Sequence, residues 1–265
     1  MNTMKMRSLL IAATAVAVTL FGQGMAAATP AGDVGSKIVG GGDATEAYSF
    51  MASMQAKATG AHRCGASLIA PQWLVTAAHC VAQQNPADYQ FRIGSTSRTG
   101  GGELVGADKF VQHPWYIPVF LGWNDIAVVH LSAPVSAEPV KIADASPDAQ
   151  TAARIIGWGL TCPERGCGQP PVTLQELNTK IESDSSCSAI PFDAQHELCV
   201  DAPNNTASAC FGDSGGPALL KADGAWRLAG ATSRGQSLRC TSGDTIYSDV
   251  TSHRDWINQQ LGSIR

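Results

Sequence analysis

From residue 38 onward, short runs of apolar or alternating residues are separated by turn-forming residues, a pattern typical of β-strands. The residues Asp223 and Gly224 are a preferred two-residue hairpin turn, and Ala-Pro-Gln at 70–72 separates another pair of runs. The runs that we expect to form strands are 65–69, 73–76, 126–131, 153–158, 218–220 and 225–230. The pattern therefore predicts an all-β domain.

Near the C-terminus the apolar spacing changes to that of a helix. Thr251 or Ser252 is expected to cap this helix, and Gly262 is expected to follow it. The apolar residues at helical spacing are Val250, Trp256, Ile257 and Leu261.

The first residues have the composition of an export signal. Lys5 and Arg7 precede an apolar run at 9–21, and three alanines at 26–28 form a small-residue cleavage site. An uncleaved anchor is disfavoured because the run is shorter than the ~20 residues of a membrane span. We predict a signal peptide at 1–28, a propeptide at 29–37, and a secreted, extracellular domain at 38–265.

Composition narrows the classes of function. The chain has 265 residues, of which 44% are hydrophobic, enough for one or two domains with real cores. Without residues 1–37, which include three basic residues and one acidic residue, the charge changes from −4 to −6. No basic run is present, so nucleic-acid binding is disfavoured. We expect a monomer that binds neither nucleic acid nor membrane.

All eight cysteines follow residue 60, as expected for an exported protein with disulfide bonds. Their spacing alone leaves the pairing open. A zinc site is disfavoured because the cysteines are dispersed and no His-x-x-x-His accompanies them. We expect no metal and no cofactor, and Asn204 begins a formal glycosylation sequon.

Three motifs carry candidate chemistry: TAAHC, NDIAV and GDSGGP, which contain His79, Asp125 and Ser214 in that order. A serine hydroxyl needs an adjacent base to act as a nucleophile, and the imidazole needs a partner that sets its tautomer. The GDSGG run also matches the G-x-S-x-G pattern of α/β-hydrolase esterases. That fold is disfavoured because its Asp and His follow the serine, within alternating strands and helices.

These motifs resemble the catalytic triad of the trypsin/chymotrypsin-like serine proteases, and the resemblance runs from IVGG at 38–41 to Trp-Ile at 256–257. It implies two antiparallel six-stranded β-barrels, about 38–145 and 146–265, with a C-terminal helix. The chain would cross between barrels at about 143–152, and the active site would lie between them. The implied activity is that of a serine endopeptidase that forms an acyl-enzyme on protein or peptide substrates; a catalytically inactive binding homologue is the alternative of another class.

The resemblance also assigns roles around the serine. Gly212 and Ser214 would form the oxyanion hole with their backbone N–H groups. Cleavage of the bond between Lys37 and Ile38 would create an ammonium that pairs with Asp213, so the chain would be a zymogen. The implied disulfides are Cys64–Cys80, Cys187–Cys199 and Cys210–Cys240, which leaves Cys162 and Cys167 to close a local loop.

The same resemblance outlines a substrate pocket. It places Ser208 at the base, where trypsin-like members carry an acid, and Phe211 at the mouth. The wall residues are Ser233, Gly235 and Thr245. A neutral base predicts cleavage after uncharged residues, and therefore activation by another protease that cuts after Lys37.

Two residues near this pocket depart from the expected pattern. Arg234 stands where the family usually has Trp, so unusual subsites are expected there. Asp244 would enter the pocket if the alignment shifted by one residue, and the alternative preference is then for Arg or Lys.

Overall fold

The computed structural model describes residue 1, residues 38–118 and residues 122–263. The predicted signal peptide and most of the predicted propeptide therefore lie outside the described residues. In chain order, the strands are β1 (Gly42–Asp43), β2 (Met51–Ala56), β3 (His62–Ala70), β4 (Trp73–Thr76), β5 (Tyr89–Ile93), β6 (Glu103–Gln112), β7 (Ala127–Leu131), β8 (Lys141–Ile142), β9 (Ala152–Gly157), β10 (Gln175–Glu182), β11 (Glu197–Val200), β12 (Pro217–Ala222), β13 (Ala225–Gly235) and β14 (Thr245–Asp249). The α-helices are α1 (Ala78–Val81) and α2 (Arg254–Ser263), and the 3₁₀ turns are Pro86–Asp88, Asp184–Cys187 and Pro203–Asn205.

Six strands close the first barrel in the order β2-β3-β4-β7-β6-β5, each antiparallel to its neighbours. Strand β5 shows why this sequence forms a barrel wall. Phe91 and Ile93 are fully buried, whereas Arg92 between them is half-buried on the other face and donates a hydrogen bond to the Gly101 carbonyl. This alternation is the two-residue period of a strand with one face on the core.

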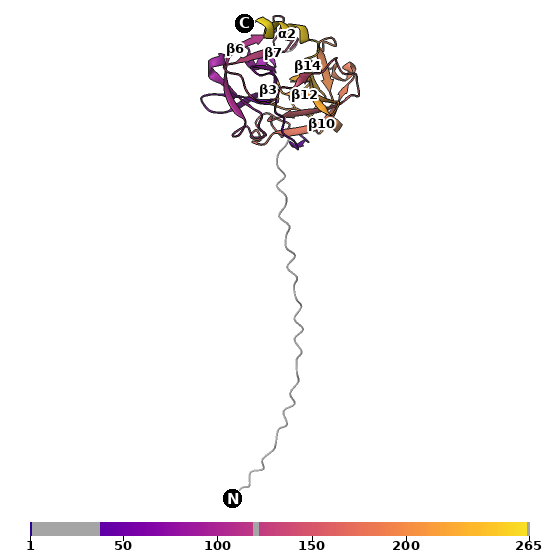
Figure 1. The fold of residues 1–265 in the computed structure, drawn as a ribbon. Coiled ribbons are helices and arrows are strands. Elements are labelled where there is room, and N and C mark those ends of the chain that lie inside the picture. The colour runs from indigo at the N-terminus through magenta and orange to yellow at the C-terminus, as the bar shows by residue number, and fades with distance from the viewer. Residues whose placement is uncertain (2–37, 119–121, 264–265) are drawn as a thin grey trace. The chain divides into compact units, whose positions relative to one another are not determined.

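The second barrel closes because β9 pairs with both β10 and β12, which completes the ring β9-β10-β11-β14-β13-β12. The predicted hairpin is present as β12 and β13. Asp223 and Gly224 have φ angles of 51° and 76°, the left-handed conformation that a tight hairpin turn requires. The fold is thus the expected pair of six-stranded antiparallel barrels with a C-terminal helix (Figure 1).

The chain passes from the first barrel to the second at residues 140–142, directly before the stretch 143–152 that the resemblance implied. Val140 still donates its N–H to Leu68 of the first barrel, but β8 directly after it pairs in parallel with β13 of the second. A two-residue strand has too few positions to show a period, so the pattern could not reveal it. At the other end of the domain, β1 already pairs with β10.

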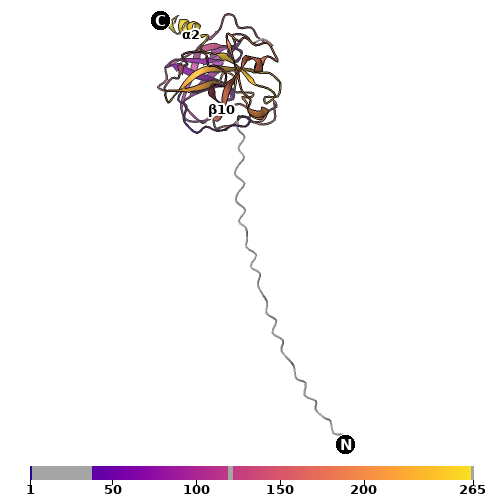
Figure 2. The same ribbon diagram turned by 90° about the vertical axis from the view of Figure 1, so that its right-hand side faces the viewer.

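Helix α2 begins two residues beyond the predicted caps. The Asp249 carboxylate accepts the N–H and hydroxyl of Thr251, which holds a turn before the helix starts at Arg254. Gly262 lies inside the last turn rather than after it. Ile257 is fully buried in the apolar cluster that contains Leu68 of the first barrel, and α2 lies at the edge of the domain in both views (Figures 1 and 2).

Candidate active site

Strand pairing brings His79 and Asp125 together. Strand β4 pairs with β7, with Thr76 opposite Ala127, so the residues that follow one strand meet those that precede the other. The backbone N–H of His79 donates to Asp125 Oδ1 at 2.8 Å, and its Nδ1 lies 2.7 Å from Oδ2. This double contact holds the ring with Nδ1 as the donor and leaves Nε2 able to accept a proton.

Asp125 is buried, with 3% of its side chain exposed, and a second donor reaches it. The Ser233 hydroxyl donates to Oδ2 at 2.7 Å from the other barrel. Although partial burial lowers the pKa of His79, the charge and hydrogen bond of Asp125 raise it above its ordinary value. The sequence placed Ser233 only on the pocket wall, and no local signal marks this contact between residues 108 apart.

Ser214 lies in the loop that precedes β12. This loop packs against the end of β4, next to His79. Gly65 donates its N–H to the Ser214 carbonyl at 2.8 Å. A Cβ on Gly215 would lie 2.2 Å from Thr76 Oγ1, so only glycine allows this approach. Among the described residues, Ser214 Oγ makes no hydrogen bond to His79. Instead, His79 Nε2 lies 3.7 Å from Cys80 Sγ.

The loop around Ser214 offers two free backbone donors. The N–H groups of Asp213, Gly215 and Gly216 donate to carbonyls of Cys210, Thr232 and Asp213. Within the described ranges, the N–H groups of Gly212 and Ser214 have no protein acceptor. Two unpaired N–H donors on either side of Asp213 can stabilise a developing oxyanion by donating hydrogen bonds to it.

His62 fixes the orientation of the Gly212 peptide. Its Nε2–H donates to the Gly212 carbonyl at 2.9 Å, and its Nδ1 accepts from the Ser53 hydroxyl at 2.8 Å. Desolvation lowers the pKa of His62 to about 4, so the ring is neutral at pH 7. No local sequence signal marks His62 as functional, because Gly212 is 150 residues away.

Asp213 is buried and forms no ion pair with any described residue. Its carboxylate accepts the N–H groups of Gly159 and Cys210, each at 2.8 Å, and none of the ion pairs among the described residues includes it. Burial raises its pKa to about 6. Ile38 is 1% exposed and packs in the core of the second barrel with Ile155 and Ala209.

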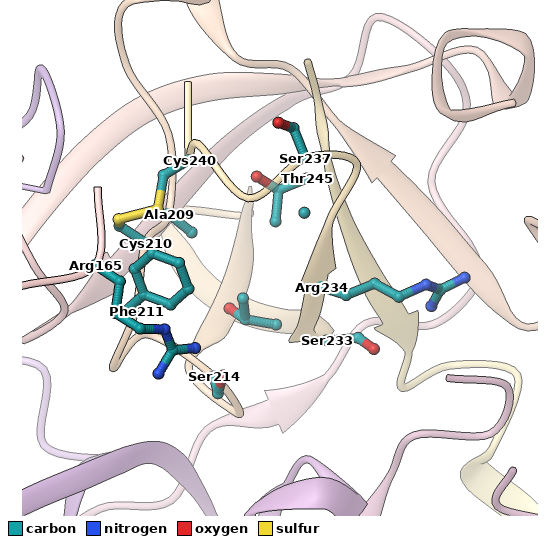
Figure 3. A pocket seen from close by; sticks show the side chains of 12 residues that line it. Arg165, Ala209, Cys210, Phe211, Ser214, Ser233, Arg234, Ser237, Cys240 and Thr245 are labelled. Atoms are coloured by element: carbon teal, nitrogen blue, oxygen red, sulfur yellow. A yellow bond between two sulfur atoms is a disulfide. The ribbon is translucent and has the colours of Figure 1, made fainter. Parts of the chain in front are cut away.

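A cavity of about 250 Å³ opens beside Ser214 (Figure 3). Four predicted pocket residues line it: Phe211, Ser233, Gly235 and Thr245. Ser208 is not among the lining residues; it is buried and donates its hydroxyl to the Cys240 carbonyl at 2.6 Å, while its neighbour Ala209 lines the cavity. No carboxylate of the described chain lines the cavity, because Asp244 turns to the Ala202 N–H at 2.9 Å.

Arg234 lines the same cavity, but its charge is already compensated. Its guanidinium contacts both oxygens of Glu197, with Nη1 to Oε1 at 2.5 Å and Nη2 to Oε2 at 3.0 Å. Figure 3 shows the side chain extending away from Ser214.

Four disulfides hold this region, and they join the pairs that the resemblance implies: Cys64–Cys80, Cys162–Cys167, Cys187–Cys199 and Cys210–Cys240. In the described part of the chain, the clusters with metal-ligand spacing contain only these bonded cysteines beside His79 or Asp244. Disulfide sulfurs offer no thiolate to a metal.

Comparisons with known proteins agree with this geometry. The family model described as Trypsin matches residues 38–257. The chain is 33% identical over 241 residues to a trypsin of Sarcophaga bullata, covering 88% of this chain and 92% of that protein. It is 32% identical over 256 residues to the vitellin-degrading protease of Bombyx mori, with 91% and 92% covered. It is also 32% identical over 241 residues to transmembrane protease serine 11C of Mus musculus, with 86% and 54% covered.

Proposed function

Because this chain belongs to the trypsin family of serine proteases and is a serine endopeptidase, we propose that His79, Asp125 and Ser214 are its catalytic residues. His79 Nε2 takes the proton of Ser214 Oγ as Oγ bonds to the substrate carbonyl carbon. The N–H groups of Gly212 and Ser214 stabilise the resulting oxyanion. His79 then passes the proton to the leaving nitrogen as the C–N bond breaks, and water hydrolyses the acyl-enzyme by the same steps.

One observation carries the assignment: the 2.7 Å contact of His79 Nδ1 with the buried carboxylate of Asp125, at the strand end against which the Ser214 loop packs. A base oriented in this way, next to a serine and two free N–H donors, suits acyl transfer.

Covalent labelling tests the assignment. The chain cleaved before Ile38 is treated with an organophosphate, and peptide mapping is expected to find the label on Ser214. The variant Ser214→Ala should lose both label and peptidase activity, whereas Ser188→Ala, a change at an exposed serine outside the cavity lining, should keep both. An unlabelled Ser214 in a folded chain would favour the inactive binding homologue.

We propose that this cavity accepts uncharged side chains such as Leu, Met, Phe or smaller ones. The lack of a lining carboxylate and the presence of Ala209, Phe211 and Thr245 support this preference, since a buried Lys or Arg needs a partner. A peptide library with every residue at the position before the cleaved bond tests it. Preferred cleavage after Arg or Lys would instead support the alternative based on Asp244.

We also propose a secreted precursor with a signal peptide at 1–28 and a propeptide at 29–37. No helix among the described residues has the length and apolar character needed to span a bilayer. A buried Asp213 without a cation, with Ile38 seated in the core, supports activation by cleavage after Lys37. Full turnover by a Lys37→Gln precursor that stays uncleaved would contradict the proposal that the chain is a zymogen.

A further inference from the structure

A second arginine, Arg165, also lines the cavity, but unlike Arg234 it has no carboxylate partner among the described residues. Arg165 lines the cavity together with Ser214, and its guanidinium lies 4.3 Å from the centre of the Phe211 ring (Figure 3). Arg165 is exposed, and among the described residues it takes part in no ion pair and no side-chain hydrogen bond. The adjacent carboxylate, Glu164, is bound by Arg239 instead.

The loop that carries Arg165 is fastened to the pocket wall. The disulfide Cys162–Cys167 closes it over a separation of five residues. Cys240 donates its N–H to the Pro163 carbonyl at 2.9 Å, and Cys240 is itself bonded to Cys210 of the cavity lining. Stacking on Phe211 further limits the side chain, so less conformational entropy is lost when the guanidinium binds a partner.

Resting on the proposed function, we propose that Arg165 makes the enzyme favour substrates with a Glu or Asp side chain next to the residue that fills the cavity. The planar guanidinium presents N–H donors that match a carboxylate, and the other arginine of the cavity is occupied by Glu197. An uncharged side chain enters the cavity, and a neighbouring carboxylate binds at its rim.

The test uses acetylated, amidated peptides that carry Leu at the cleaved bond and Glu or its neutral isostere Gln at each of two positions on either side. For the cleaved wild-type enzyme, the Glu/Gln ratio of kcat/KM is expected to reach roughly three- to tenfold at one of these positions. The ratio should fall towards one as salt is raised, because salt screens exposed charges.

Variants assign the effect to Arg165. Arg165→Gln should bring the ratio to about one, and Arg165→Glu should invert it. Lys109→Gln removes an exposed cation outside the cavity lining and should leave it unchanged. A double Cys162→Ser, Cys167→Ser variant should reduce the ratio without abolishing turnover.

Organophosphate titration of Ser214 separates this inference from the proposed function. A labelled enzyme with no Glu preference at any position, or with the same preference in Arg165→Gln, overturns the role of Arg165 alone. An enzyme that is neither labelled nor active overturns the proposed function, and this inference with it.

Discussion

Ser233 shows how one side chain joins the two halves of the candidate site. It follows Thr232 on β13 of the second barrel, yet its hydroxyl donates to Asp125 of the first barrel at 2.7 Å. A buried carboxylate needs its lone pairs satisfied, and each hydrogen bond to a charged group contributes more than a neutral one. Ser233 therefore helps to hold the Asp125 carboxylate in the position that faces His79.

Replacing Ser233 by Ala should lower kcat between about ten- and a hundredfold, because a hydrogen bond to a charged group contributes roughly 1.5–3 kcal/mol. Steady-state kinetics with a Leu-containing peptide measure this change. Ser248→Ala is the matched control, since the Ser248 hydroxyl donates to the backbone carbonyl of Asp125 at 2.8 Å and not to its carboxylate. Equal losses in both variants would contradict a role of Ser233 at the carboxylate.

Asp213 makes the stability of the uncut precursor depend on pH. Its pKa is about 6 in the folded chain against 3.8 as the ordinary value, so the folded state binds the proton more tightly. The free energy of unfolding should therefore fall as pH rises from about 4 to about 6, by roughly 3 kcal/mol. Guanidinium unfolding of the Ser214→Ala precursor at several pH values measures this slope.

Asp213→Asn in the same background isolates the contribution of this carboxyl. The variant lacks the titrating group, so the difference between the two proteins should carry the slope. Parallel curves for the two proteins from pH 4 to 7 would show that the carboxyl of Asp213 does not titrate with a raised pKa in the folded precursor.

At the scale of elements, two short segments decide where the base lies: the end of β4 and helix α1. The helix has four residues and no side-chain cap, so it has little stability of its own. It is held by the Cys64–Cys80 disulfide and by the bond from the His79 N–H to Asp125. The position of His79 thus depends on covalent and tertiary contacts rather than on helix propensity.

Removing the Cys64–Cys80 bridge by two Ala substitutions should cost about 3 kcal/mol of stability, because its loop spans 16 residues. The measurement is guanidinium unfolding, combined with turnover in the cleaved form. A Cys162→Ala, Cys167→Ala variant serves as control: its shorter loop should cost about 2 kcal/mol. Turnover on a Gln-containing peptide should fall in the first variant and stay near wild type in the second.

At the scale of the whole molecule, the first and last elements of the domain, β1 and α2, each contact the barrel that they do not directly adjoin in sequence. Strand β1 joins the sheet of the second barrel, and α2, which follows β14 of that barrel, buries Ile257 in the cluster that contains Leu68 of the first. These contacts resist separation of the barrels, which matters because the candidate site takes His79 from one barrel and Ser214 from the other.

Ile257→Ala should destabilise the molecule by roughly 2–5 kcal/mol, since it removes a fully buried side chain. Gln259→Ala, on the exposed face of the same helix, should change stability by no more than about 0.5 kcal/mol. Thermal unfolding of both variants provides the comparison. Similar melting temperatures would show that α2 does not hold the barrels.

The sequence by itself determined what depends on neighbouring residues. The expected strands at 73–76 and 126–131, the hairpin turn at Asp223 and Gly224, and the order of the three motifs are all readable without coordinates, because pleating and turn chemistry act over a few residues. They are enough to predict the all-β fold, and the family resemblance adds the two barrels.

Only the tertiary structure decided which distant groups touch. It joined Ser233 to Asp125 and His62 to Gly212, turned Asp244 away from the cavity, and left Arg165 without a carboxylate partner in the described chain. A hydrogen bond between residues more than a hundred positions apart depends on which strand ends meet when the barrels close. No local period or turn signal encodes that meeting.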